Sequence, residues 1–180
     1  MRKMFVVAAF GAVLSGTACT EVPHARPTDT GLVRNGDFEI GTSALAEGWK
    51  VEHGDVAFIT RKQGGSGFQM VFNGDDRDDV LIASEHIAVS AGATYTFSLD
   101  YYQPTGDGFI GGARFEVRWL DQSKTLAGSS ILEGTAVGRW TVLQHTVRAP
   151  DRAAYAELVV GRAPHPSVVS VDNVALYERR

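Results

Sequence analysis

The stretch Leu32-Val33-Arg34-Asn35-Gly36-Asp37-Phe38-Glu39 is the one around which the rest of the chain is expected to be organised. The Asn-Gly pair predicts a tight turn that ends a short strand and leads into an apolar Phe followed by an acid. A second stretch near the end, Val169-Ser170-Val171-Asp172-Asn173-Val174-Ala175-Leu176, alternates like a half-buried strand and carries one Asp. We expect the two stretches to work together.

The composition predicts one globular domain preceded by a secretory signal. With 180 residues, of which 44% are hydrophobic and 21% charged, the chain can bury a sizeable core. Met1-Arg2-Lys3 is positively charged, residues 4–14 are apolar, and Ser15-Gly16-Thr17-Ala18 is a small-residue cleavage region, as in a signal peptide. The apolar run is too short for a membrane-spanning anchor. We assign residues 1–18 to the signal, 19–30 to a tether and 31–180 to the domain.

The single cysteine, Cys19, directly follows the small residues, as the lipidated cysteine of a bacterial lipoprotein does. Three residues before it stands Gly16, where a lipobox usually has Leu, so simple cleavage after Ala18 remains the alternative. The sequence therefore predicts an exported protein, either in the cell envelope through a lipid anchor or secreted. A lone cysteine excludes an internal disulfide.

The charge of the chain argues against nucleic-acid binding. Loss of residues 1–18 removes two of the 17 basic residues and none of the 21 acidic ones, which leaves a net charge of -6. A nucleic-acid-binding protein would be expected to carry a basic patch.

From residue 31 onward, short alternating runs are separated by Gly, Asp, Asn and Pro, which predicts an all-β sandwich. The expected strands are Gly31 to Val33, Lys50 to Val51, Val56 to Thr60, Phe68 to Phe72, Val80 to Val89, Thr94 to Tyr102, Ala113 to Leu120, Trp140 to Arg148, Tyr155 to Val160 and Val168 to Tyr177.

Two of these runs have a readable core face. Tyr95, Phe97, Leu99 and Tyr101 share one side of residues 94–102, and Phe115, Val117 and Trp119 share one side of residues 113–120. If the Gly-rich segment 103–112 closes the two runs as an antiparallel hairpin, the outward acids Asp100 and Glu116 lie close together. Arg114 and Arg118 would then neutralise them.

Four signatures occur in a fixed order over residues 32 to 177: Asn35-Gly36-Asp37-Phe38-Glu39, Gly48-Trp49, Gly92 to Ser98, and a closing Val-Asp-Asn-Val-Ala-Leu. Together they resemble the CenC-like carbohydrate-binding modules of families 4, 9 and 22. The resemblance implies a jelly-roll β-sandwich of the galactose-binding-like type that binds an oligo- or polysaccharide without cleaving it. Such modules are usually appended to a glycoside hydrolase, whereas we expect a free-standing module here.

The resemblance also implies a structural calcium ion. Its ligands would be the Glu39 carboxylate, a backbone carbonyl near Gly36 or Asp37, and Asp172 of the last strand, because calcium takes six to eight oxygen ligands. The family often adds an acid before the strand that begins here at Phe68, but this chain has Gln63-Gly64-Gly65-Ser66-Gly67. The alternative is that Glu39 and Asp172 only cap turns.

The sugar-binding face is expected at Tyr102, Asp100, Glu116, Arg114, Arg118 and Arg77, together with the aspartates around Arg77. Trp49, Trp119 and Trp140 fall where the family keeps structural aromatics, and the Trp that many members present before the strand near Val80 is replaced by Asp75-Asp76-Arg77-Asp78-Asp79. A lining of arginines and acids suits a charged or short, hydroxyl-rich sugar. The alternative is that these residues form an ordinary solvated sheet face.

Catalysis is not expected. The five histidines are scattered, no Gly-x-Ser-x-Gly elbow occurs, and Asp100 and Glu116 could act as a glycosidase pair only within the hairpin. We therefore predict a non-catalytic carbohydrate-binding module. The alternatives are a structural or protein-interaction lipoprotein of the envelope that has lost the sugar site and, third, a glycoside hydrolase.

Overall fold

The computed structural model describes residues 31–54, 57–61, 67–73, 77–104, 111–132 and 138–179. Within these ranges the chain forms eleven strands and no helix. The strands are β1 (Trp49–His53), β2 (Ala57–Arg61), β3 (Phe68–Phe72), β4 (Val80–Ser84), β5 (Ile87–Ala88), β6 (Thr94–Tyr102), β7 (Ala113–Leu120), β8 (Leu126–Leu132), β9 (Thr141–Arg148), β10 (Tyr155–Arg162) and β11 (Val169–Glu178). The signal, Cys19 and the tether lie outside the described residues.

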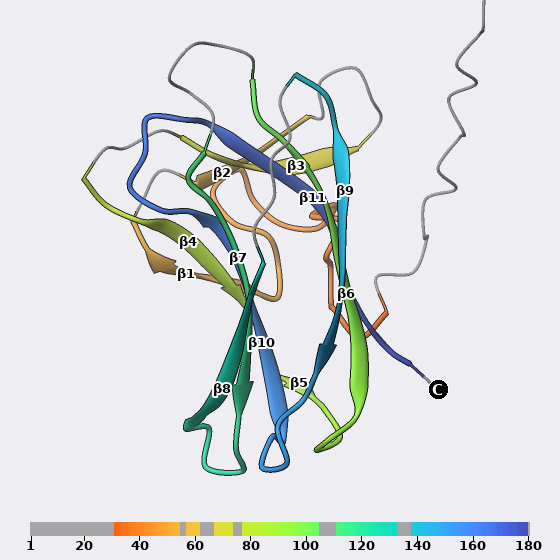
Figure 1. Cartoon of the computed structure of the whole chain (residues 1–180). Coiled ribbons are helices and arrows are strands. Elements are labelled where there is room, and N and C mark those ends of the chain that lie inside the picture. The colour runs from red at the N-terminus through yellow and green to blue at the C-terminus, as the bar shows by residue number, and fades with distance from the viewer. Residues whose placement is uncertain are drawn as a thin grey trace, which may run out of the picture.

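Two antiparallel sheets pack face to face (Figure 1). Sheet 1 has the order β1-β4-β10-β7-β8, with β5 paired to β10, and sheet 2 has the order β2-β3-β11-β6-β9. Successive strands often change sheet, since β6 lies in sheet 2, β7 in sheet 1, β9 in sheet 2 and β10 in sheet 1. The predicted all-β jelly-roll sandwich is confirmed.

The predicted hairpin of β6 and β7 is wrong. Both edges of β6 are hydrogen-bonded, to β11 and β9, and both edges of β7 are hydrogen-bonded, to β10 and β8. A strand has only two edges, so β6 and β7 cannot pair, and the chain between them crosses from one sheet to the other. Asp100 and Glu116 therefore belong to different sheets.

The core lies between the sheets, where the predicted alternation places it. Tyr95, Phe97, Leu99 and Tyr101 of β6 and Phe115, Val117 and Trp119 of β7 are all buried. Rings meet across the two sheets, with centroids 5.3 Å apart for Tyr101 and Phe115 and 5.8 Å apart for Tyr95 and Trp119. Both face assignments made from the sequence are confirmed.

Asn35 organises the turn that the sequence placed at Asn-Gly. Its backbone has φ of 50°, which Asn tolerates better than most residues. Its side-chain amide donates to the carbonyls of Ile40 (2.6 Å) and Glu47 (3.0 Å), while its Oδ1 accepts from the Ile40 amide at 3.0 Å. Its own carbonyl accepts from the Trp49 indole at 3.1 Å, and this places Trp49 against Phe38, with ring centroids 5.2 Å apart.

The same turn is fastened to the last strand. The Val174 amide donates to the Gly36 carbonyl at 2.8 Å, and the Leu32 amide donates to the Leu176 carbonyl at 2.9 Å. A β-bulge in β11 at Asn173, whose φ is 50°, shifts the register and presents Val174 to the turn. The two stretches singled out in the sequence therefore do lie together.

Three strand expectations need correction. The Gly31 to Val33 run makes only an isolated bridge, from Gly31 to Leu176. The run from Val80 to Val89 is divided into β4 and β5, because the Ser84 hydroxyl accepts the Leu158 amide at 2.9 Å where a ladder carbonyl would otherwise do so. β8 was missed, since its Gly and Ser residues weaken a strand pattern.

The Asn35 turn can be tested by substitution. We expect Asn35→Ala to lower the free energy of unfolding by about 2 to 3 kcal/mol, because three side-chain hydrogen bonds and the tolerance for positive φ are lost. Asn35→Asp keeps the acceptor and the tolerance and should cost less. Urea unfolding followed by tryptophan fluorescence measures both, and equal stability of the Ala variant and the parent would contradict this role.

Candidate functional site

The structure divides the predicted sugar-binding residues between two outer faces, meaning the sheet faces turned away from the core. Arg114, Glu116 and Arg118 lie on the outer face of sheet 1, because their β7 neighbours Phe115 and Val117 are buried. Asp100 and Tyr102 lie on the outer face of sheet 2, and Arg77 is exposed in the segment before β4. The six residues thus do not form one site.

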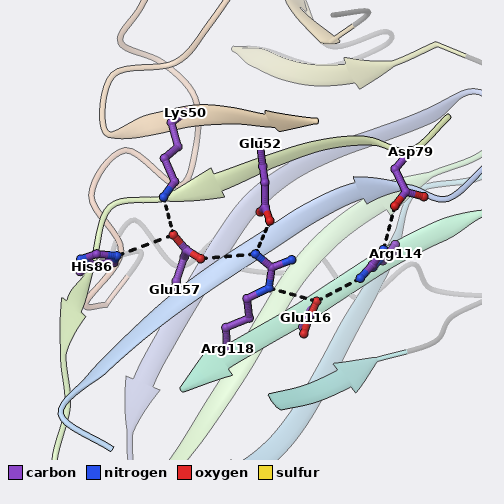
Figure 2. A network of polar contacts seen from close by, with 8 residues as sticks. All are labelled: Lys50, Glu52, Asp79, His86, Arg114, Glu116, Arg118 and Glu157. Atoms are coloured by element: carbon purple, nitrogen blue, oxygen red, sulfur yellow. Dashed lines mark hydrogen bonds and ion pairs between the residues drawn. The ribbon is translucent and has the colours of Figure 1, made fainter. Parts of the chain in front are cut away.

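On sheet 1, eight charged or titratable side chains form one continuous network (Figure 2). We call this set the charged face: Lys50, Glu52, Asp79, His86, Arg114, Glu116, Arg118 and Glu157. Its members come from β1, β7, β10 and the ends of β4. The cross-strand register brings Glu157 of β10 directly opposite Arg118 of β7, so residues distant in sequence become neighbours.

Arg118 is the centre of the network. Its Nε lies 3.4 Å from Glu116 Oε2, and its Nη1 lies 3.5 Å from Glu157 Oε2 and also donates to Glu52. Burial disfavours the charged guanidinium, but the hydrogen bond to Glu52 and the charges of Glu52, Glu116 and Glu157 outweigh it and raise the pKa of Arg118. The guanidinium is therefore a fixed cation that holds three carboxylates in place.

Arg114 and Lys50 extend the network to its two ends. Arg114 Nη1 donates to Asp79 Oδ2 at 3.0 Å, and its Nη2 lies 3.5 Å from Glu116 Oε2. At the other end, Lys50 Nζ lies 2.7 Å from Glu157 Oε1. Every carboxylate of the charged face is thus ion-paired, and side chains link β1 to β10 and to β7, and β7 to β10.

Two of these carboxylates are unusually buried for an outer face. Glu116 is 6% exposed and Glu157 is 5% exposed. Glu157 Oε1 forms an ion pair with Lys50 Nζ at 2.7 Å, and no hydrogen bond reaches this oxygen from the residues that the structure describes. The cations beside the two buried carboxylates therefore compensate their charge.

An aromatic ring lies beside the buried carboxylate. Tyr155 precedes Glu157 by two residues on β10, so it shares the outer face, and it is only partly buried. The His86 ring lies next to it, with centroids 6.1 Å apart, and His86 Nε2 is 3.8 Å from Glu157 Oε1. This end of the charged face therefore combines ring surface with polar groups.

Sequence reasoning missed Lys50, Glu52, His86, Tyr155 and Glu157 as members of this face, whereas it expected Asp79 there as one of the aspartates around Arg77. One signal was available, because Tyr155, Glu157 and Val159 alternate with the apolar Ala156, Leu158 and Val160. The alternation predicts which side of β10 Glu157 occupies. It does not predict that β10 lies between β4 and β7, and this placement is what brings Glu157 to Arg118.

The outer face of sheet 2 holds the other predicted residues. The Tyr102 ring packs against Trp140, with centroids 5.8 Å apart, and Asp100 Oδ2 accepts from the Asn173 side chain at 2.7 Å. Asp100 is also directly opposite Asp172 of β11. Trp49 and Trp119 are core residues, as the resemblance implied, whereas Trp140 is only partly buried.

The predicted metal ligands lie at the turn that closes onto β11. Glu39 Oε1 accepts from the Phe68 amide at 2.8 Å, Asp172 Oδ1 accepts from the Asn173 amide at 2.7 Å, and the Gly36 carbonyl is the one bonded to Val174. Across the described ranges, no three His, Cys, Asp or Glu side chains converge on one point. The Glu39 and Asp172 carboxylates and the Gly36 carbonyl are oxygen donors of the type that calcium prefers.

The chain was compared with known proteins. No protein-family model and no curated protein matches this chain. Among solved structures, a family 16 carbohydrate-binding module matches with a TM-score of 0.61 at 20% identity, over 82% of this chain and 99% of that chain. The CBM22-1 xylan-binding domain of Xyn10C from Paenibacillus barcinonensis gives 0.57 at 12% identity, over 79% and 90%.

The enzymatically active domain of tailspike protein 4 from bacteriophage CBA120 also matches, with a TM-score of 0.61 at 12% identity. The match covers 83% of this chain but only 22% of the tailspike chain. At these identities the similarity establishes the fold, which is the jelly roll of carbohydrate-binding modules, as the sequence resemblance implied.

In the part of the chain that the structure describes, no helix is long and apolar enough to cross a membrane.

The central role of Arg118 can be tested through stability. We expect Arg118→Ala to lower the free energy of unfolding by about 2 kcal/mol, less than for a fully buried pair because Arg114 and Lys50 still accompany Glu116 and Glu157. Arg118→Lys should cost less, and Glu157→Gln added to Arg118→Ala should recover part of the loss. Chemical unfolding of the parent, Arg118→Ala, Glu157→Gln and the double variant forms a double-mutant cycle, in which strict additivity would rule out the coupling.

Proposed function

We propose that the chain binds carbohydrate without cleaving it, through the charged face of sheet 1. The observation that carries the proposal is Glu157, a buried carboxylate on an outer face that Arg118 and Lys50 hold in place on the same face as the partly buried Tyr155 ring. The fold supports the proposal, because it is the fold of carbohydrate-binding modules.

The groups of the charged face suit a sugar. Neighbouring hydroxyls of a pyranose can donate to a carboxylate and accept from a guanidinium, and Glu157 and Arg118 offer both side by side. Because the ion pairs already fix these side chains, little rotamer entropy is lost on binding. The partly buried Tyr155 ring supplies the apolar surface on which the C–H face of a sugar ring can pack.

The charge balance narrows the ligand class to neutral, hydroxyl-rich sugars. The face has three permanent cations, Lys50, Arg114 and Arg118, and four carboxylates, and every cation is ion-paired with one or more of the carboxylates. An acidic polysaccharide would have to compete with Glu52, Asp79, Glu116 and Glu157 for these cations. A neutral sugar can instead bridge donors and acceptors that are already in place.

Catalysis is not part of the proposal. A glycosidase needs one carboxylic acid that stays protonated to donate to the leaving group, and such acids are usually kept in apolar surroundings. Every carboxylate of the charged face is instead paired with a cation, and Asp100 lies on the other sheet. The geometry therefore supports binding.

A second candidate is a structural or protein-interaction role. It is favoured by the segment before β4, where Arg77, Asp78 and Asp79 stand in place of the Trp that many modules of this type present, and where Asp79 is bound to Arg114. In this reading the charged face links four strands and binds no sugar.

We further propose export with residues 1–18 as the signal and Cys19 as the site of lipid attachment, which would hold the domain at the cell envelope.

The sugar-binding face can be located with three variants. In a glycan-array screen of the segment from Thr20 to Arg180, we expect a neutral oligosaccharide to bind the parent protein. Tyr155→Ala and Arg118→Lys should weaken this binding about tenfold or more, because a packing surface or a bidentate donor is lost. Tyr102→Ala, an aromatic truncation on the outer face of sheet 2, is the matched control and should bind like the parent.

Three outcomes would count against the proposal. A folded parent protein that binds no glycan favours the structural role and directs the search to envelope proteins. Loss of binding in Tyr102→Ala alone would move the site to sheet 2. Preferential binding of acidic polysaccharides would contradict the charge argument.

We also propose a structural calcium ion between the first turn and the last strand, held by Glu39, Asp172 and the Gly36 carbonyl, with Asp37 beside them. The oxygen donors and their position support it, and Gly67 packs so closely that a Cβ there would lie 2.2 Å from Glu39 Oε1. Calcium would bind only the folded protein and so would raise its melting temperature by several degrees over that in a chelator.

Melting curves in calcium and in chelator test this proposal. The difference should vanish in Asp172→Asn and persist in Glu178→Gln, which neutralises an exposed acid at the end of the same strand. Identical melting curves for the parent protein in calcium and in chelator would contradict the proposed calcium site.

A further inference from the structure

Besides the two-residue strand β5, the described part of the two sheets has four edge strands, and one of them differs in chemistry. On β2, the Ile59 amide already donates to the Ser43 carbonyl at 3.1 Å. β1 carries Lys50, Glu52 and His53 and has a bulge between Val51 and His53, and β9 carries His145 and Arg148. Charges and bulges of this kind prevent an edge from pairing with another chain. β8, with the sequence LAGSSIL, contains no charged residue, no His and no Pro.

One side of β8 is paired and the other is open. Residues Gly128 to Leu132 pair in regular register with Trp119 to Phe115 of β7, and the only irregularity lies at the Leu126 end. β8 is the last strand of its sheet, visible at the lower left of Figure 1. Within the described ranges, no further backbone hydrogen bond reaches residues 126–132.

The open edge also exposes apolar side chains. Ile131 is 64% exposed and Leu126 is 58% exposed, the first and third most exposed of the large hydrophobic residues described. Ile131 lies opposite Glu116, at the border of the charged face. An uncharged edge with exposed aliphatic side chains and a free hydrogen-bonding side is the feature that strand addition requires.

We propose that β8 pairs antiparallel with β8 of a second copy of this chain. The argument for a second copy is electrostatic. In a two-fold interface the same strand meets itself, so a charge close to the axis faces or neighbours an identical charge in the partner. β8 carries no charge and avoids that repulsion in every register.

The regular segment Gly128 to Leu132 fits such a pair. With Ser130 on the two-fold axis, Ser129 faces Ile131 of the other copy, and the two Ile131 side chains become diagonal neighbours on the outer face. Gly128 and the serines let the backbones approach without bulky groups between them. The sheets of the two copies then form one continuous sheet, with both charged faces on the same side.

The strength of the dimer can be estimated from its size. Pairing of two edge strands buries less than the roughly 800 Å² per partner of a standard interface, so we expect a dissociation constant in the range of about 10 to 100 μM. The inference does not depend on what the charged face binds.

Sedimentation velocity of the segment from Thr20 to Arg180, over concentrations from about 1 to about 500 μM, tests the pairing across that range. The parent protein should change from monomer to dimer. Ile131→Lys should raise the dissociation constant at least tenfold, because the added charges become diagonal neighbours. Val142→Lys is the matched control, since it replaces an exposed β-branched residue opposite an acid, Asp100, on edge strand β9, and it should dimerise like the parent.

Amide hydrogen exchange provides a second measurement. In the parent protein the amides of residues 126–132 should exchange more slowly as the concentration rises, and in Ile131→Lys they should not. A folded parent protein that stays monomeric throughout overturns the proposal. So does a dimer that survives Ile131→Lys and is broken by Val142→Lys, because its interface would then be β9.

Discussion

The closure of the first turn onto the last strand is the constraint on which the sandwich depends. The Gly36 carbonyl accepts the Val174 amide, and the same turn places Trp49 against Phe38 through the Asn35 carbonyl. Because β11 lies between β3 and β6 in sheet 2, the bond ties the beginning of the domain to the middle of a sheet. Contacts between such distant parts of the chain form late and slowly in folding, so the Asn-Gly turn is a local structure that prepares them.

Much of the fold could be predicted because alternation is a local property. β3, β6 and β7 have the bounds read from the sequence, and the core faces of β6 and β7 follow from their period of two. β8 escaped notice because its Gly and Ser residues carry little strand preference, and its place is set by β7 beside it. Sheet membership could not be read from the sequence, since it depends on which edges other strands occupy.

Sheet membership also decides which residues form the candidate site, so the sequence could not predict the whole site. The sequence identified Arg114, Glu116 and Arg118 correctly as outward residues of one strand, and it joined them to Asp100 and Tyr102 through a hairpin that does not form. Their partners instead come from β1, from β10 and from Asp79 just before β4. Buried ion pairs add little net stability, because desolvation offsets most of their attraction. A network this large on an outer face is therefore better explained by the positioning of its groups than by stability.

Charge pairing decides what both proposed surfaces can bind. On the charged face, Arg118 and its carboxylates satisfy one another, which disfavours an ionic ligand and leaves hydroxyls as the matching chemistry. On the edge, β8 lacks charge altogether, so no like-charge repulsion opposes its pairing with a second copy. Ile131 stands at the boundary, with its backbone in the open edge strand and its side chain opposite Glu116. Because one substitution there adds a cation beside an acid of the same copy and a like charge across the two-fold axis, it should leave the monomer folded while it disrupts the pair.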